Sequence, residues 1–167
     1  MSQVTFSAAV VTLSDKAAAG ERADKSGEII KQMLIEAGYL VEASILLPDV
    51  LELIKFALEG LSERNINLII TTGGTGFSKR DVTPEATLAI AHRNAPGIAE
   101  AIRHHSLSIT GRAMLSRGVA VIRGSTLIVN LPGSPKAVKE SLEYILPHLR
   151  HGIEILSEKT GECGGHL

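Results

Sequence analysis

The hydrophobic pattern of the chain alternates between stretches typical of strands and stretches typical of helices. The run from Val4 to Leu13 is almost entirely apolar and stops at Ser14-Asp15, which predicts a strand buried on both faces. From Tyr39 to Leu47 apolar side chains recur at every second position, which predicts a strand with one buried face. Residues 67–72 form a short, strongly apolar third strand that leads directly into a run of glycines.

The segments between these strands repeat apolar side chains at the three- and four-residue spacing of amphipathic helices. The first helix has Asp24 or Ser26 as its expected N-cap and Gly38 as its expected stop. A later helix is expected to begin at Thr83-Pro84-Glu85, with a capping hydroxyl, a first-turn proline and an acid near the positive end of the helix dipole. The other helices are expected after Pro48-Asp49, within residues 97–116 in one or two pieces, and after Ser134-Pro135, where Pro147 is expected to disturb the helix.

Two late strands, at residues 119–122 and 126–129, are separated by Arg123-Gly124-Ser125, which predicts a hairpin. The preceding order of strand, helix, strand, helix, strand, helix is typical of a mainly parallel sheet that is covered on both faces. The fold class that we expect is therefore a three-layer α/β/α domain with a mainly parallel sheet and an antiparallel hairpin. We expect residues 1–160 to form this single domain and residues 161–167 to form a flexible tail.

The composition of the 167 residues is that of an ordinary globular protein, with 44% apolar and 21% charged residues. Aromatic residues make up only 3% and the formal net charge is -1, which argues against a nucleic-acid or membrane-surface partner. No apolar stretch approaches the roughly 20 residues of a membrane-spanning helix. The start of the chain lacks a signal-peptide pattern, and the single Cys163 allows no internal disulfide, so we expect a cytoplasmic protein.

The third strand runs into the sequence TTGGTGFSKRDVTPE, which begins at Thr71 and contains three glycines within four positions. Glycines let backbone N–H groups converge on an anion, and a nearby helix N-terminus favours negative charge. The stretch lacks both the Gly-Lys-Ser/Thr of a Walker loop and the third glycine of a dinucleotide fingerprint. Two interpretations stay open: a strained turn at the end of the strand, or a phosphate-binding loop formed by Gly73, Gly74, Thr75 and Gly76.

Four loops are expected at the carboxyl ends of the parallel strands, which is where open α/β sheets bind their ligands. Two of these loops carry Asp49 and Asp81, a pair of acids that suits Mg²⁺, although either acid alone is more often a cap or turn residue. Ser14-Asp15 bounds the same cleft or forms a simple turn. The fourth loop provides either a second anion site or an ordinary helix start, and it contains Pro132, Gly133, Ser134 and Pro135.

Taken together, these motifs strongly resemble the signature of the molybdenum-cofactor biosynthesis proteins that bind molybdopterin. The resemblance rests on the glycine run with Arg80-Asp81-Val82-Thr83-Pro84-Glu85, on Thr12-Leu13-Ser14-Asp15 with Gly20, Asp24, Ser26 and Gly27, on Pro48-Asp49 and on Asn130-Leu131-Pro132-Gly133-Ser134-Pro135. It covers the chain from the first strand to the last helix, in the same order. It points to the branch whose members transfer AMP from ATP to molybdopterin.

The resemblance implies roles for specific residues. Asp49 and Asp81 would be the catalytic residues and would organise Mg²⁺ and the reacting phosphates. The loops would bind substrate and nucleotide through Ser14, Asp15, Gly73, Gly74, Thr75, Gly76, Pro132, Gly133, Ser134 and Pro135. The resemblance also implies a homotrimer and a partner protein that inserts molybdate.

Three functions remain to be distinguished at this point. The first is an ATP- and Mg²⁺-dependent enzyme that adenylylates molybdopterin and releases pyrophosphate. The second is a non-catalytic molybdopterin-binding module or carrier of the same family, and the third is a nucleotide-binding domain of unrelated chemistry. The presence of both Asp49 and Asp81 favours the enzyme.

Overall fold

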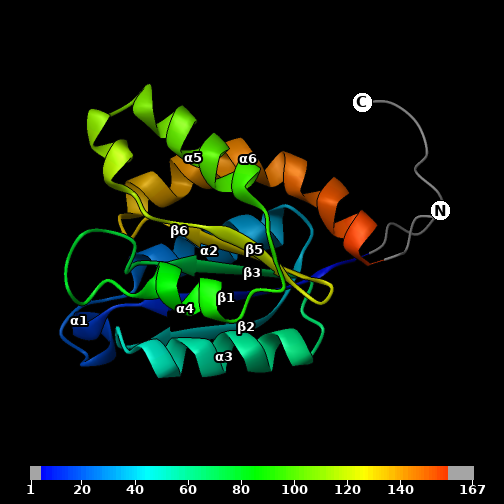
Figure 1. Ribbon diagram of the computed structural model, residues 1–167, viewed down its shortest axis with the longest axis horizontal. Helices are drawn as coiled ribbons and strands as arrows, with labels where there is room; N and C mark the ends of the chain where they lie inside the picture. The colour runs from blue at the N-terminus through cyan, green and yellow to red at the C-terminus, as the bar shows by residue number, and fades with distance from the viewer. Residues whose placement is uncertain (1–4, 158–167) are drawn as a thin grey trace.

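Six strands form one sheet in the order β2-β1-β3-β6-β5-β4, as the computed structural model of the chain shows for residues 5–157 (Figure 1). The first four strands in this order are parallel to one another, β5 is antiparallel to β6, and β4 is antiparallel to β5. The strands are β1 (Ser7–Leu13), β2 (Leu40–Leu47), β3 (Leu68–Thr72), β4 (Arg93–Asn94), β5 (Ala120–Arg123) and β6 (Thr126–Leu131). The helices are α1 (Asp15–Ala18), α2 (Lys25–Glu36), α3 (Leu51–Glu63), α4 (Thr83–Ala89), α5 (Pro96–Leu107), the 3₁₀-helix η1 (Gly111–Leu115) and α6 (Pro135–Leu156).

The helices cover both faces of the sheet because successive side chains of its central strands point to opposite faces. On β1, Ala8 and Val10 pack into a cluster with residues of α2, α5 and α6, while Ala9 and Val11 pack with residues of α3 and α4. Figure 1 shows α5 and α6 above the sheet and α3 below it. The predicted fold class, a three-layer α/β/α arrangement with an antiparallel hairpin, is confirmed.

The predicted strand types are also confirmed. Burial along β1 is nearly continuous, as expected for a strand that is covered on both faces. Exposure along β2 alternates from one residue to the next, because this strand lies at the edge of the sheet. The helix α2 is capped by Asp24, whose carboxylate accepts a hydrogen bond from the backbone N–H of Gly27 at 2.8 Å.

Some element boundaries differ from the predictions. Thr83 does not cap α4, because the N-cap is Val82, and the Thr83 hydroxyl instead donates a hydrogen bond to the carbonyl of Gly73 at 3.0 Å. The helix expected at Pro48-Asp49 begins only at Leu51. The short α1 and the two-residue β4 were not predicted, because each is too short to carry a hydrophobic period.

Pro147 lies inside α6 without ending it, since the helix continues from residue 135 to residue 156. Pro147 has no N–H to bind the carbonyl of Glu143, and both residues are exposed. No helix within residues 5–157 is long and apolar enough to cross a membrane. The predicted tail, residues 161–167, and the domain limit at residue 160 lie outside the described residues, and both stay predictions.

Candidate active site

Four loops meet at one edge of the sheet because β2, β1, β3 and β6 are parallel and end in register. Leu13 pairs with Leu47, Thr12 pairs with Thr72, and Thr72 pairs with Leu131. The residues that follow these strand ends therefore lie along one edge. The loops contain all the predicted site residues: Ser14 and Asp15, Asp49, Gly73 to Gly76 with Asp81, and Pro132 to Pro135.

Position 73 needs a glycine because of the neighbouring strand β1, not because of a ligand. Its φ of +94° lies in a region that side chains rarely adopt, and a Cβ at this position would lie 2.2 Å from the backbone oxygen of Leu13. The carbonyl of Gly73 accepts the hydrogen bond from Thr83 described above. At Gly73 the structure therefore agrees with the first of the two interpretations of this sequence, a strained turn at the end of the strand.

Gly74 and Gly76 each lie against one of the two predicted catalytic acids. A Cβ on Gly74 would lie 2.8 Å from Asp49 Oδ1, and a Cβ on Gly76 would lie 2.9 Å from Asp81 Oδ2. Cβ atoms essentially never approach another atom this closely, so a side chain at either position would displace a carboxylate. The absence of side chains at Gly74 and Gly76 therefore leaves room for the two carboxylates beside the backbone of the loop.

The glycine loop, which comprises Gly73 to Gly76, also presents hydrogen-bond donors through its backbone N–H groups. The carbonyl of Gly74 accepts from the N–H of Thr83 at 3.1 Å, and the carbonyl of Thr75 accepts from the N–H of Arg117 at 2.9 Å. Within residues 5–157, the backbone N–H groups of residues 74–77 have no acceptor in the protein. Such unsatisfied donors are what an anion-binding loop offers to a phosphate group.

Asp15 and Asp49 hold each other's loops in place through reciprocal hydrogen bonds. The N–H of Asp15 donates to Asp49 Oδ2 at 3.1 Å, and the N–H of Asp49 donates to Asp15 Oδ1 at 3.0 Å. The guanidinium of Arg80 then binds both oxygens of Asp15, at 2.9 Å through Nε and at 2.8 Å through a terminal nitrogen. Sequence reasoning did not include Arg80 among the site residues, although its place next to Asp81 in the motif was a signal.

The two linked acids have opposite pKa shifts. Hydrogen bonds from Arg80, and then from the backbone of Asp49, lower the pKa of Asp15. Burial raises the pKa of Asp49, and the negative charges of Asp15 and Asp81 raise it further. Asp49 Oδ1 is buried and has no hydrogen-bond partner within residues 5–157. Asp49 is therefore the member of this linked pair of acids that forms no ion pair of its own among the described residues.

Replacing Arg80 with glutamine is expected to raise the pKa of Asp15 toward its ordinary value of 3.8, because the main group that favours its charged form is removed. The measurement is an NMR titration of the side-chain carboxyl carbons in buffer without divalent cations. The control is Arg64→Gln, which removes a guanidinium that pairs with Glu42 at 3.5 Å outside the site. An Asp15 titration curve that is the same in wild type and Arg80→Gln would contradict the ion pair.

The acids fit a magnesium ion only together with ligands from a substrate. Within residues 5–157, no group of three or more His, Cys, Asp or Glu side chains is arranged to hold a metal ion. Mg²⁺ commonly binds through one or two carboxylates, with the remaining ligands supplied by water and substrate phosphates. The unpartnered oxygen of Asp49, with Asp81 close enough to raise its pKa, matches that oxygen-only chemistry.

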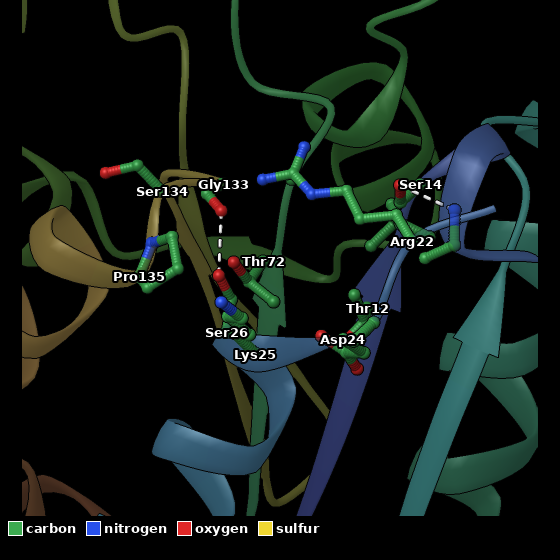
Figure 2. A pocket seen from close by; sticks show the side chains of 14 residues that line it. Thr12, Ser14, Arg22, Asp24, Lys25, Ser26, Thr72, Gly133, Ser134 and Pro135 are labelled. Atoms are coloured by element: carbon green, nitrogen blue, oxygen red, sulfur yellow. Dashed lines mark hydrogen bonds between the residues drawn. The ribbon is translucent and has the colours of Figure 1, made fainter.

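A polar pocket of about 320 Å³ opens on one side of the glycine loop (Figure 2). The start of α2 and the start of α6 both line this pocket, and the hydroxyl of Ser26 joins them by donating to the carbonyl of Gly133 at 2.8 Å. The hydroxyl of Thr12 is buried in its wall without a partner. Figure 2 shows the Arg22 side chain extending across the pocket from the side of Ser14 toward that of Gly133.

Some predicted residues line this pocket and others do not. Ser14, Gly73, Gly133, Ser134 and Pro135 are in its wall. Sequence reasoning did not select the other polar residues of the wall, which come from the strand ends and from the segment that leads into the first turn of α2: Thr12, Arg22, Asp24, Lys25, Ser26 and Thr72. Two helix N-termini and the basic side chains give the pocket the character of an anion site.

A second pocket, of about 290 Å³, contacts the same two loops at other residues. Its wall includes Thr75, Gly76 and Pro132, together with residues of α5, η1 and the first turn of α6. No sequence motif marks α5 and η1, so sequence reasoning did not find this pocket. Asp15, Asp49 and Asp81 line neither pocket.

Comparison with known proteins agrees with this arrangement. A family model described as "Probable molybdopterin binding domain" matches residues 9–151. The molybdopterin adenylyltransferase of Haemophilus influenzae is 46% identical over 141 residues, which cover 81% of this chain and 71% of that protein. Gephyrin of Dictyostelium discoideum is 41% identical over 160 residues, which cover 90% of this chain but only 22% of gephyrin.

Comparison with solved structures indicates the same family. The molybdopterin biosynthesis enzyme MoaB of Thermus thermophilus is 44% identical and superposes with a TM-score of 0.88, over 95% of this chain and 100% of that chain. The family model matches well over half of the chain, and the fold of this solved relative is the fold described above. The chain belongs to the molybdopterin-binding domain family of molybdenum-cofactor biosynthesis.

Proposed function

We propose that this protein is a molybdopterin adenylyltransferase that uses ATP and Mg²⁺ and releases pyrophosphate. Relatives that carry the name molybdopterin adenylyltransferase are 37% to 46% identical to the chain. The observation in the structure that carries the proposal is the position of Asp49 and Asp81 against Gly74 and Gly76, where the backbone N–H groups of residues 74–77 have no acceptor among the described residues. This arrangement combines carboxylates for a metal with donors for a phosphate.

The two pockets beside the glycine loop suit two substrates that must meet. We assign one substrate to each pocket, because both pockets contact the glycine loop and the loop of residues 132–135. The reacting phosphates would then lie between the pockets, over Gly74 to Gly76. Holding two reactants in line in this way removes much of the entropic barrier to reaction.

The reaction requires little covalent participation from the protein. A phosphate oxygen of molybdopterin attacks the α-phosphorus of ATP, and the bond from that phosphorus to the oxygen of the leaving pyrophosphate breaks. The backbone N–H groups of residues 74–77 would donate hydrogen bonds to phosphate oxygens as negative charge develops. Thr83 supports these donors indirectly, because its N–H and hydroxyl bind the carbonyls of Gly74 and Gly73.

Asp49 and Asp81 would hold the metal. When bound there, Mg²⁺ would neutralise charge on the pyrophosphate leaving group. The bidentate contact with Arg80 satisfies Asp15, which leaves Asp49 as the less compensated acid. We therefore assign the direct metal contact to Asp49 and Asp81 and a supporting role to Asp15.

The alternative of a non-catalytic carrier is less well supported. It accounts for a molybdopterin pocket but gives no reason for two acids to lie against the glycine loop. The adenylyltransferase name of the relatives also favours the enzyme.

A direct assay tests the proposed function. Protein mixed with molybdopterin, ATP and Mg²⁺ is expected to release pyrophosphate and form adenylylated molybdopterin in equal amounts, as measured by a coupled pyrophosphate assay and mass spectrometry. Omission of molybdopterin, or addition of EDTA, should abolish both signals, because the acceptor or the metal is then missing. Molybdopterin binding without any ATP-dependent product would instead identify a carrier.

We further propose that the protein acts as a homotrimer in the cytoplasm and passes its product to a protein that inserts molybdate. These proposals rest on the resemblance to the family, and the cytoplasmic location also on the single cysteine of the chain, which suits a reducing compartment. Light scattering that gives the mass of one or two chains of 17.7 kDa would contradict the trimer.

A further inference from the structure

Arg117 donates hydrogen bonds to two carbonyls of the glycine loop, although it lies far from that loop in sequence. Its backbone N–H donates to the carbonyl of Thr75 at 2.9 Å. Its guanidinium donates to the carbonyl of Gly76 at 2.7 Å and to the carbonyl of Asp81 at 2.7 Å. It also forms an ion pair with Glu85 in the first turn of α4.

These contacts fix the orientation of peptide groups in the loop. In a trans peptide the C=O and the following N–H point in opposite directions. Because Arg117 binds the carbonyls of Thr75 and Gly76, the N–H groups of Gly76 and Phe77 point away from Arg117. The guanidinium of Arg117 therefore orients the N–H group of Phe77, and the backbone N–H of Arg117 orients that of Gly76.

The same side chain also positions Asp81. The carbonyl of Asp81 is held at 2.7 Å by Arg117, while its carboxylate accepts from the N–H of Ser78 at 2.9 Å. The pKa of Glu85 is lowered, first by its hydrogen bond with Arg117, so the pair is held together as two charged groups. Five donors in a planar guanidinium allow one side chain to bind several acceptors at once, which a lysine ammonium on its flexible stem does less well.

We propose that Arg117 is a positioning residue for adenylyl transfer, which holds the N–H groups of the glycine loop and Asp81 in the reactive arrangement without touching the substrates. This inference rests on the proposed function, because it assigns the aligned groups to that reaction. The orientation of the loop by Arg117 is a separate claim that can be measured without substrate.

The test compares Arg117→Ala and Arg117→Lys with a matched control, Arg123→Ala. Arg123 also donates to a backbone carbonyl, that of Ile90 at 2.8 Å, and also pairs with an acid, Glu59 at 3.7 Å. Its side chain is 22% exposed, compared with 33% for Arg117. Neither arginine lines the two pockets, but Arg123 lies in β5 and donates to Ile90 rather than to the glycine loop. Steady-state kinetics, Mg²⁺ dependence, thermal unfolding and amide hydrogen exchange are measured for each variant.

Arg117→Ala is expected to lower kcat about 100-fold, since misplacement of aligned groups by about 1 Å has an effect of this size. The Mg²⁺ concentration for half-maximal rate should rise, because Asp81 is no longer held. Arg117→Lys should lose less activity than Arg117→Ala. Arg123→Ala should keep the wild-type kcat and Mg²⁺ dependence, even if its unfolding temperature falls as much as that of Arg117→Ala.

Hydrogen exchange distinguishes failure of this inference from failure of the proposed function. The amides of Ser78 and Asp81, which donate hydrogen bonds within this segment, should exchange faster in Arg117→Ala, with no change in β1 and β3. If this exchange is unchanged, or if Arg117→Ala turns over at the wild-type rate, the positioning role is wrong. If the wild-type protein shows no adenylyl transfer while the exchange result holds, the proposed function fails and the structural role of Arg117 remains.

Discussion

Replacing Asp49 with asparagine is expected to lower kcat for adenylyl transfer roughly 100-fold or more, while it makes the metal-free protein more stable near neutral pH. The loss of activity follows from the loss of a charged oxygen ligand for Mg²⁺. The gain in stability follows from burial and from the negative charges of Asp15 and Asp81, which together raise the pKa of Asp49. Asparagine can still accept the hydrogen bond that the N–H of Asp15 donates to this side chain.

The dependence of stability on pH has a definite sign. A carboxyl whose pKa is higher in the folded protein binds more protons there than in the unfolded chain, so its ionisation destabilises the fold. This penalty appears as the pH rises through the window from the ordinary pKa of 3.8 to the raised value, and it is complete above that window. The difference in free energy of unfolding between Asp49→Asn and wild type should therefore be largest near neutral pH and should disappear at acid pH.

Urea denaturation in EDTA at several pH values, together with the pyrophosphate assay, measures both effects. Asp81→Asn is the companion variant, because its carboxylate already accepts a hydrogen bond from the N–H of Ser78. It should lose turnover as Asp49→Asn does, but it should gain less stability, because it removes only the repulsion between Asp81 and Asp49 and leaves the burial of the Asp49 charge in place. Full activity in both variants would overturn the metal assignment, and an Asp49→Asn protein that is less stable at neutral pH would contradict the penalty for burial.

The fold was predictable because its signals are local. Continuous apolar runs and alternating positions identified β1, β2 and β3, and the spacing of apolar residues identified the helices. The parallel order then determined that the loops after the strands would share one edge, which brought Asp49, Asp81 and the glycine loop into one region. That step needed no side-chain detail, which is why it succeeded.

The parts of the site that were missed depend on contacts between distant residues. Arg117 binds Gly76 across 41 positions of sequence, and Arg80 binds Asp15 across 65 positions. No periodicity or local motif reports such pairs. The sequence also could not separate the roles of the glycines, because only the three-dimensional surroundings show that Gly73 faces a strand backbone while Gly74 faces Asp49.

Replacing Gly74 with alanine is expected to abolish measurable turnover and also to destabilise the fold. Its φ of +63° disfavours any side chain, at a cost of about 1 kcal/mol. The added Cβ would in addition lie 2.3 Å from the hydroxyl of Thr83 and 2.8 Å from Asp49 Oδ1. Both neighbours belong to the proposed site, so relief of the clash would move Asp49 or break the contacts that hold the glycine loop.

Gly124→Ala is the control that separates the cost of the positive φ from the cost of the steric clash. Gly124 has a φ of +57°, close to that of Gly74, but a Cβ there would meet no heavy atom within 4 Å. It lies in the turn between β5 and β6, so its variant should show the backbone cost alone, about 1 kcal/mol in urea denaturation, with wild-type turnover. Gly74→Ala should lose more stability than this control, because overpacking adds its own cost. If both variants lost the same stability and Gly74→Ala stayed active, the contact between Gly74 and Asp49 would have no part in catalysis.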